Sequence, residues 1–214
     1  MEILFEDEDL IVVEKPSGLL TIATAKEKQR TLYALLYSYL KGQRPPEKLF
    51  IVHRLDREAS GLLVFAKQES AKFNLQQQFK LHSARRTYLA VVEGRISRDE
   101  WTLDSILAEN AAYRCYSTRD RRQGKHAITH VKVLKRTAER TLVEVRLETG
   151  RKHQIRVHLA EQGHPIVGDK TYGSRTDPLH RLALHASKLA FRHPRTGESM
   201  EFHASPAAVF SKLV

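Results

Sequence analysis

The fold class of this chain is decided by a stretch in its second half, residues 127–147, which read AITHVKVLKRTAERTLVEVRL. Ala127–Leu134 and Leu142–Leu147 are β-branched or alternating segments of strand length. Three further segments favour strands: Thr87–Val92, Leu182–Phe191 and Ser199–His203. Because strands dominate and do not alternate regularly with helices, the sequence predicts an α+β fold with a mixed, mostly antiparallel sheet flanked by helices.

The first half of the chain alternates short predicted strands with predicted helices. Thr31 has the character of an N-cap for a helix that ends at Gly42, with an apolar face of Leu32, Leu35, Leu36 and Tyr39. Two more helices are expected at Ser70–Lys80 and Lys152–Gln162. The remaining expected elements are strands at Ile3–Phe5, Leu10–Val13, Phe50–Val52 and Leu62–Ala66, and turns at Lys15–Gly18 and Pro45–Pro46.

Length and composition indicate an ordinary globular chain. Its 214 residues, with no internal repeat and no Gly/Ser-rich or Pro-rich linker, predict a single domain over residues 1–214. The longest uninterrupted apolar run, Leu32–Tyr37, is six residues, which is too short to span a bilayer. The acidic start lacks the pattern of a signal peptide, and the one cysteine, Cys115, excludes an internal disulfide framework. The cytoplasm is therefore the expected location.

Charge is the first clue to function. Thirty-six lysines and arginines against 25 acidic residues give a net charge of +11, and the pI is about 9.8. A basic surface of this size suits a polyanion such as nucleic acid, although a basic protein without such a partner remains an alternative. Charge alone does not distinguish RNA from DNA.

The densest polar cluster in an apolar setting is HRLDREASG, residues 53–61, which lies between two predicted strands. Asp56 stands between Arg54 and Arg57, and these cations favour its ionised form. An ionised carboxylate on a loop held by strands is a usable nucleophile or general base. The alternative is a surface loop in which Asp56 caps a helix or pairs locally with Arg57.

Two other clusters favour anionic partners. Residues 150–158, GRKHQIRVH, place a glycine and several cations at an expected helix start, although a basic solvated helix face would look the same. Arg85 and Arg86 precede Tyr88, and an aromatic beside arginines can stack on a base while the arginines hold its phosphates. A tyrosine at a strand start can equally belong to the core. For the basic segment Arg119–His126, nucleic-acid contact and mere solvation stay open.

The 11 histidines do not form a metal-binding pattern. His153 and His158 are five residues apart, and no His-Glu-x-x-His is present. His126 and His130 are four apart, but they fall in a predicted strand, where that spacing is too long for a compact site. We therefore expect no metal site.

Taken together and in this order, the clusters resemble the RluA-type family of pseudouridine synthases. Residues 53–61 match its His-Arg-Leu-Asp-x-x-Thr-Ser-Gly signature, except that Ala59 replaces the usual threonine and its hydroxyl. The match extends almost end to end. Its other motifs are KPSG (15–18), YLA (88–90), EG (93–94), GRKHQIRVH (150–158), GHPIVGD (163–169), HA (185–186), HP (193–194) and TGE (196–198).

The resemblance implies the fold of a pseudouridine synthase catalytic domain, without the small N-terminal RNA-binding domain of some relatives. It makes Asp56 the catalytic carboxylate, Tyr88 the residue that stacks on the base, and Arg156 the partner of Asp56. Whether Asp56 attacks the sugar or removes a sugar proton stays open. The residues expected to contact RNA are Arg54, Arg57, Arg85, Arg86, Arg151, Lys152 and His153.

The function expected from these features is isomerisation of specific uridines in ribosomal or transfer RNA, by base flipping and without a cofactor. We expect a stem-loop RNA as the partner, no membrane association, and a monomer. Two alternatives come from other classes: an RNA chaperone of the same fold without catalysis, and a nucleoside or glycoside hydrolase with paired carboxylates. An RNA chaperone has no use for an anionic carboxylate, Asp56, that faces phosphates. A hydrolase needs a second carboxylate, and none is evident, since Glu58 would point in another direction on an extended segment.

Overall fold

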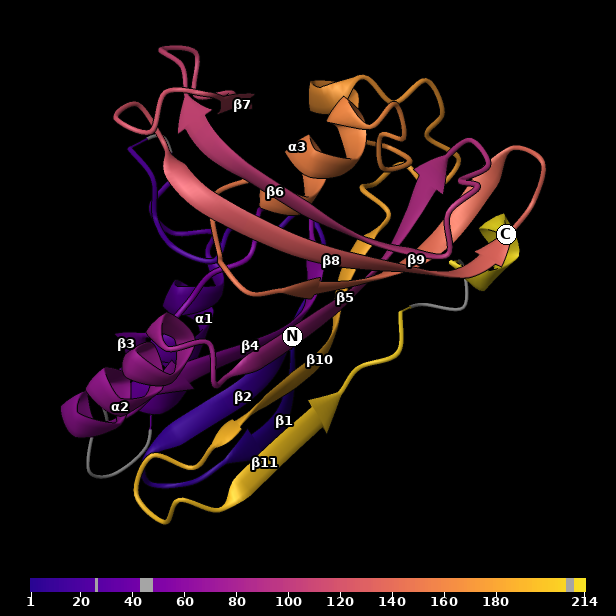
Figure 1. Ribbon diagram of the computed structural model, residues 1–214. Coiled ribbons are helices and arrows are strands. Elements are labelled where there is room, and N and C mark those ends of the chain that lie inside the picture. Colours follow the sequence, from indigo (N-terminus) through magenta and orange to yellow (C-terminus); the bar gives the residue numbers. More distant parts are fainter. Residues whose placement is uncertain (26, 43–47, 207–209) are drawn as a thin grey trace. The chain divides into compact units, whose positions relative to one another are not determined.

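The computed structural model describes residues 1–25, 27–42, 48–206 and 210–214, and its contacts divide the chain into two units (Figure 1). The first unit comprises Met1–Arg85 and Ala186–Ala204, and the second comprises Arg86–His185 and Ser205–Val214. The turn expected at Pro45–Pro46 lies outside the described residues. The single domain expected over residues 1–214 stays a prediction, and each unit is described by itself.

The first unit is a sheet with two helices. In chain order its elements are β1 (Glu2–Glu6), β2 (Leu10–Lys15), α1 (Leu32–Lys41), β3 (Phe50–Ile51), β4 (Ser60–Ala66), α2 (Glu69–Lys80), β10 (Leu184–Arg192, from Ala186 onward) and β11 (Ser199–His203). The strand order is β1-β2-β4-β10-β11, with β3 also paired to β4. Strand β2 runs antiparallel to both β1 and β4, and β11 runs antiparallel to β10.

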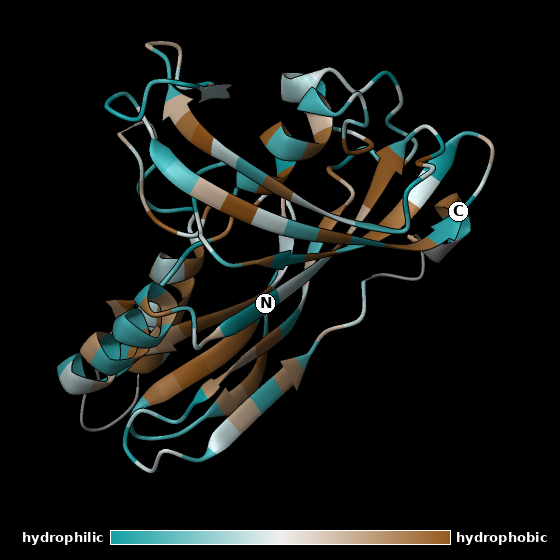
Figure 2. Cartoon of the chain, in the orientation of Figure 1, coloured by the Kyte–Doolittle hydropathy of each residue, from teal (hydrophilic) through white to brown (hydrophobic). Residues whose placement is uncertain are grey.

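The core of this unit forms around β2 and β4, which are buried along nearly their whole length and largely brown in Figure 2. Continuous apolar runs of this kind are typical of strands that are covered on both faces. Leu10 and Val12 of β2 pack with Leu62 and Val64 of β4 in a cluster that also contains Leu75 of α2. The core therefore fixes the strand that follows the Asp56 loop.

Helix α1 begins as expected and buries a different face. Thr31 caps its start, since the Thr31 Oγ1 accepts a hydrogen bond from the Ala34 N–H at 3.0 Å, and Gly42 ends it. The buried residues are Leu32, Leu36 and Leu40. The predicted face was wrong for two members: Leu35 is 48% exposed and Tyr39 is 44% exposed. An apolar row at i, i+4 and i+8 supplies a complete inward stripe, so the other apolar residues are left outside.

The second unit is an antiparallel sheet with one α-helix. Its elements are β5 (Arg85–Glu93), β6 (Glu100–Glu109), β7 (Cys115–Thr118), β8 (Lys125–Arg136), β9 (Arg140–Leu147), α3 (Gln154–Glu161) and the 3₁₀ turns η1 (Lys170–Tyr172) and η2 (Ser211–Leu213). The strand order is β5-β9-β8-β6-β7, and all these pairings are antiparallel. The predicted α+β class with a mostly antiparallel sheet is confirmed.

Two features of the second unit were not predicted from the sequence. Strands β6 and β7 were not expected, because β6 carries charged residues and β7 is only four residues long. Helix α3 begins at Gln154 and not at Lys152, because His153 has a left-handed backbone with φ of 54°. None of the helices within the described ranges is long and apolar enough to cross a membrane.

Candidate active site and RNA-binding loops

The loop that carries Asp56 joins β3 to β4, and its backbone is held on both sides of this residue. The Thr21 hydroxyl donates to the Leu55 carbonyl at 2.8 Å and accepts from the Leu55 N–H at 3.2 Å. On the other side, the Gly18 N–H donates to the Arg57 carbonyl at 2.8 Å. Because both chain neighbours are fixed, the backbone of Asp56 has little freedom. The loop leads into a strand, so the alternative of a helix cap is excluded.

A buried lysine connects the loop after β2 to the loop that carries Asp56. Lys15 is 0% exposed, and its Nζ donates to the carbonyls of Pro16, Leu19 and Arg57 at 2.9, 2.7 and 3.1 Å. An ammonium has three donors, and burying it is costly unless these donors are satisfied. The first two carbonyls belong to the loop after β2 and the third to the Asp56 loop. The sequence marked this segment as a turn and as one motif of the resemblance, but it did not reveal Lys15 as a positioning residue.

Gly61 lets the end of this loop lie against β10. Its φ is +109°, and a Cβ at this position would be 2.3 Å from the Ala186 carbonyl oxygen. Only glycine fits such an approach with a positive φ. Ala59 lies two residues before Gly61 and is 2% exposed. Its methyl group places no hydroxyl in this buried position.

The cations of the Asp56 loop are exposed. Both Arg54 and Arg57 reach solvent, and the Nε of Arg57 donates to the Gly18 carbonyl at 3.1 Å. Arg57 therefore helps to hold the loop closed. Arg54 is the side chain better suited to contact an RNA phosphate.

In the second unit, Tyr88 lies in β5 opposite Val145 of β9 and is 6% exposed. Arg85 at the start of this strand is exposed, whereas Arg86 is partly buried and donates through Nη2 to the Glu148 carbonyl at 3.3 Å. Burial lowers the pKa of Arg86. A Cβ on Gly150 would be 2.5 Å from the Nη1 of Arg86, so the Arg86 guanidinium lies directly against the loop of residues 149–153.

Arg156 on α3 forms a buried ion pair that the sequence did not indicate. Its Nε and Nη2 donate to the two carboxylate oxygens of Asp169 at 2.7 and 2.8 Å, and the side chains are 4% and 0% exposed. Asp169 also caps η1 by accepting from the Tyr172 N–H at 3.3 Å. Two parallel bonds to one carboxylate fix the plane of the guanidinium. Asp56 belongs to the other unit, so its pairing with Arg156 stays a prediction.

Tyr172 forms a second, unforeseen support for α3. Its hydroxyl lies 2.8 Å from His153 Nδ1 and accepts from the Cys115 N–H at 3.1 Å, while the Arg156 guanidinium lies 5.1 Å from its ring centre. Burial raises the pKa of Tyr172 to about 12, so the phenol stays neutral. His153 stands at the N-cap of α3, so it lies just before the helix that was expected to include it.

The loop before α3 is fixed by the buried amide of Gln154. Its oxygen accepts from the Thr149 hydroxyl and the Arg151 N–H, at 2.8 and 3.0 Å. Its nitrogen donates to the Ile128 carbonyl and the Thr129 hydroxyl, both at 2.9 Å. All four hydrogen bonds of the amide are therefore made within the protein. The Arg151 side chain is exposed beside this rigid loop, a geometry that suits a phosphate contact.

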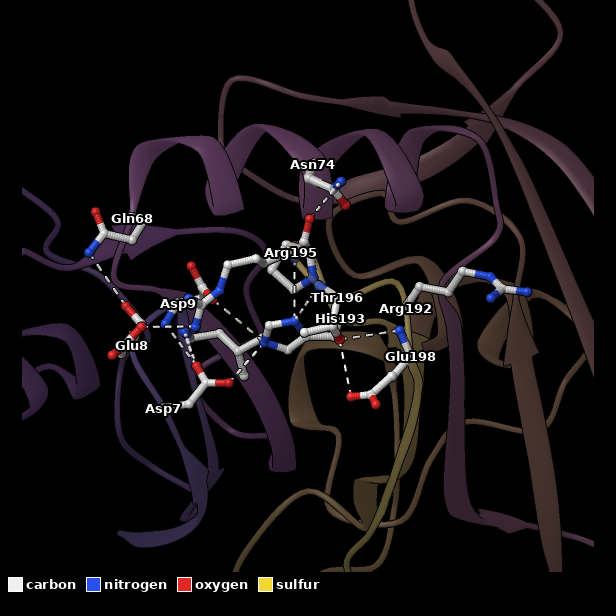
Figure 3. Close-up of polar contacts among 12 residues, drawn as sticks. Asp7, Glu8, Asp9, Gln68, Asn74, Arg192, His193, Arg195, Thr196 and Glu198 are labelled. Carbon is white, nitrogen blue, oxygen red and sulfur yellow. Dashed lines mark hydrogen bonds and ion pairs between the residues drawn. The ribbon is translucent and has the colours of Figure 1, made fainter.

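One group of side chains has the composition of a metal site. Asp7, Asp9 and His193 offer ligand atoms that lie within 4.8 Å of one another (Figure 3). Arg195 already pairs with one carboxylate of this group, since its Nε donates to Asp9 at 2.6 Å. His193 Nε2 lies 2.8 Å from Asp7, and its Nδ1 accepts from the Thr196 N–H at 3.1 Å. The group therefore joins the β1–β2 turn to the turn after β10.

Solved structures place the fold in a known class. The described chain superposes on human RNA Pseudouridylate Synthase Domain Containing 1 with a TM-score of 0.79, at 27% identity, covering 96% of this chain and 83% of the other. Human RNA Pseudouridylate Synthase Domain Containing 4 shares the fold, with a TM-score of 0.81 at 24% identity and coverage of 98% and 90%. The fold is therefore that of the RNA pseudouridylate synthases.

Sequence comparisons identify the family. The model of the RNA pseudouridylate synthases matches residues 9–161. An uncharacterized RNA pseudouridine synthase of Bacillus subtilis, YlyB, is 42% identical over 100% of this chain and 72% of its own length. Ribosomal large subunit pseudouridine synthase D of Zymomonas mobilis is 40% identical over 95% of this chain and 68% of its own length. The chain belongs to the RNA pseudouridylate synthase family and is an RNA pseudouridine synthase, and the resemblance to the RluA type is confirmed.

Proposed function

We propose that this enzyme converts specific uridines in stem-loops of ribosomal or transfer RNA to pseudouridine, with Asp56 as the catalytic carboxylate and without a cofactor. The proposal rests on the hydrogen bonds that fix the backbone on both sides of Asp56, at Leu55 and at Arg57. A side chain that must meet one sugar atom needs such a preorganised backbone. The relative named as a ribosomal large subunit synthase supports ribosomal RNA as a substrate.

The chemistry requires only groups that the chain supplies. The bond from the ribose C1′ to N1 of uracil breaks, and a bond from C1′ to C5 forms. C5 loses its proton and N1 gains one, so atoms and electrons balance without an oxidant or reductant. Asp56 either attacks the sugar or removes a sugar proton, and each role needs the ionised carboxylate. In this scheme Tyr88 stacks on the base and Arg156 pairs with Asp56.

The RNA is held by cations outside the reacting centre. Exposed side chains at Arg54, Arg85 and Arg151 suit phosphate contacts, which position the substrate without reading its sequence. Lys152 and His153 are partly exposed in the same loop as Arg151. Arg57, Arg86 and Arg151 also donate to backbone carbonyls, so these three side chains help to hold the loops in shape as well. Flipping the uridine costs a few kcal/mol of unstacking, which favours a loop over a duplex.

Replacement of Asp56 tests the proposal. Asp56→Asn keeps the shape and removes the carboxylate, so we expect no pseudouridine and an RNA affinity within a few fold of wild type. Glu58→Gln, in the same loop and exposed, is the matched control and should remain active. Nucleoside analysis of the treated RNA separates the three classes of function: pseudouridine for a synthase, released uracil for a hydrolase, and unchanged uridine for a chaperone. Turnover by purified Asp56→Asn would contradict the assignment.

The substrate is found by comparing RNA from cells with and without the gene. Pseudouridine-specific chemical sequencing of ribosomal and transfer RNA should reveal positions that lose modification in the deletion strain. Loss at a stem-loop uridine is the expected result, and loss confined to duplex positions would contradict the flipping argument. A cytoplasmic location and a monomeric state remain predictions.

A further inference from the structure

The turn between β6 and β7 presents an aromatic side chain in an unfavourable backbone conformation. Tyr113 has a φ of 60° and is 75% exposed. The other non-glycine residues with positive φ in the described ranges are all histidines: His82, His153 and His180. Histidine, asparagine and aspartate adopt this region several times more often than other residues, whereas a bulky tyrosine there is an outlier. Strain of this kind persists where the surrounding structure imposes it, and it clusters at functional sites.

The turn itself imposes the conformation. The Asn110 side-chain oxygen accepts from the N–H groups of Ala112 and Arg114, both at 3.0 Å. The Tyr113 N–H donates to the Asn110 carbonyl at 2.9 Å, and the Asn110 N–H donates to the Arg114 carbonyl at 3.0 Å. These four bonds close the turn around one residue with positive φ. Glycine or asparagine would occupy that position without strain, and tyrosine gains no burial in exchange.

One cation lies beside the exposed ring, and a second, Arg114, is its neighbour in the chain. Lys152 Nζ lies 5.4 Å from the Tyr113 ring centre and donates to the Tyr113 carbonyl at 3.1 Å. Glu109 forms an ion pair with the same ammonium and keeps it in place. The guanidinium of Arg114 lies 5.5 Å from the ring centre of Tyr172, the residue that supports α3. The turn is thus anchored to the loop that carries Arg151.

We propose that Tyr113 is a stacking platform for an unpaired RNA base, and that Arg114 and Lys152 contact the adjoining phosphates. An exposed aromatic ring beside cationic side chains that can reach the backbone is the arrangement that binds single-stranded nucleic acid with little sequence preference. A protein partner would favour an apolar surround, and here the neighbours of the ring are charged. The inference rests on the proposed function only in taking RNA as the ligand, since Tyr113 contributes no step of the isomerisation.

Variants that separate strain from stacking test the proposal. Tyr113→Gly and Tyr113→Asn both accept positive φ and remove the ring, whereas Tyr113→Phe keeps the ring. The probes are a fluorescently labelled short oligouridylate and a fully paired RNA duplex. The glycine and asparagine variants should bind the oligouridylate roughly 5- to 150-fold more weakly, the range measured for one stacked base. Tyr113→Phe should bind like wild type, and duplex affinity should not change.

Two further readouts distinguish stacking from a structural role. Tyr113→Gly and Tyr113→Asn should raise the melting temperature by about 2–4 °C for each kcal/mol of strain relieved, so affinity falls while stability rises. They should also leave the salt dependence of binding unchanged, whereas Lys152→Met should weaken that dependence because a phosphate contact is lost. Tyr37→Ala, which removes a ring that is 45% exposed on α1 and stacks on Tyr33, is the matched control and should change neither affinity.

Wild-type affinity of Tyr113→Gly for the oligouridylate would overturn the proposal. A fall in both melting temperature and duplex affinity would overturn it as well, because the residue would then be structural. The test does not depend on catalysis, since pseudouridine formation by the wild-type enzyme is measured separately. An inactive wild type with weakened binding by Tyr113→Gly would refute the proposed function and leave this inference standing.

Discussion

Thr21 shows how a single hydroxyl can fix the loop that carries Asp56. This hydroxyl donates to the Leu55 carbonyl and accepts from the Leu55 N–H, in the residue before Asp56. Thr21 is 2% exposed and Leu55 is 7% exposed, so water does not replace these bonds. The position of the Asp56 carboxylate therefore depends on a residue 34 positions earlier than Leu55 in the chain.

Thr21→Val keeps the shape of the side chain and removes both hydrogen bonds. We expect a stability loss of about 1–3 kcal/mol for the unsatisfied Leu55 groups, and a slower single-turnover rate at saturating enzyme. Thr21→Ser keeps the hydroxyl and should restore most of that rate. Denaturant unfolding and single-turnover kinetics measure the two effects. An unchanged rate in Thr21→Val would remove Thr21 from the positioning residues.

The pair of Arg156 and Asp169 gives a second prediction at this scale. Asp169→Asn removes the carboxylate that accepts two hydrogen bonds from the buried Arg156 guanidinium, which should destabilise the enzyme by about 1.5–3 kcal/mol. Arg156→Lys keeps the charge and loses the planar fork, so some turnover should remain, and Arg156→Ala should retain less. Thermal unfolding is measured alongside single-turnover rates. Equal single-turnover rates for the wild type, Arg156→Lys and Arg156→Ala would mean that Arg156 contributes only to the stability of the fold.

Among the elements, the β1–β2 turn and the turn after β10 are joined by a group whose strength depends on pH. Burial raises the pKa of Asp7, but hydrogen bonds from the Leu10 and Asp9 N–H groups and from His193 outweigh it and hold the pKa below the ordinary 3.8. A carboxyl whose folded pKa is depressed stabilises the fold above its unfolded pKa. That contribution disappears as the pH falls through the folded pKa.

Asp7→Asn should accordingly lower stability by about 1 kcal/mol at neutral pH, where the charge-assisted bond to His193 is lost. The difference from wild type should narrow once the pH falls below 3.8. Urea unfolding at a series of pH values measures this difference. Exposed Asp99→Asn on the second unit is the control. A difference that widens as the pH falls below 3.8 would contradict the sign of the shift in the Asp7 pKa.

For the whole molecule, the dominant property is a net charge of +11. RNA binding should weaken linearly in a plot of log affinity against log salt, because each phosphate contact releases counterions. Arg151→Ala should reduce the magnitude of that slope by about 0.7–0.9, the value of one contact, and leave the saturated single-turnover rate unchanged. Lys188→Ala, which removes a cation paired with Glu201 on β11, should leave the slope unchanged. An unchanged slope in Arg151→Ala would exclude Arg151 as a phosphate contact.

The sequence by itself determined the parts of this protein that depend on neighbours in the chain. Thr31 caps α1 through the residue three positions later, and β8 and β9 lie where the alternating segments predicted them. The motif around Asp56 indicated both the family and the candidate carboxylate, because the order of its residues carries the resemblance. Local propensity and short spacing are sufficient for features of this kind.

Only the tertiary structure decided which distant groups meet. Lys15 donates to Arg57 across 42 residues, and Arg156 reaches Asp169 across 13. The exposure of Leu35 on α1 also depended on which side of the helix is buried in the folded chain. Nothing in a local pattern specifies the partner of a buried charge, because that partner is chosen when strands and helices pack and every enclosed donor must find an acceptor. The sequence motifs identify the candidate site residues, and long-range packing determines which of their side chains meet and in what geometry.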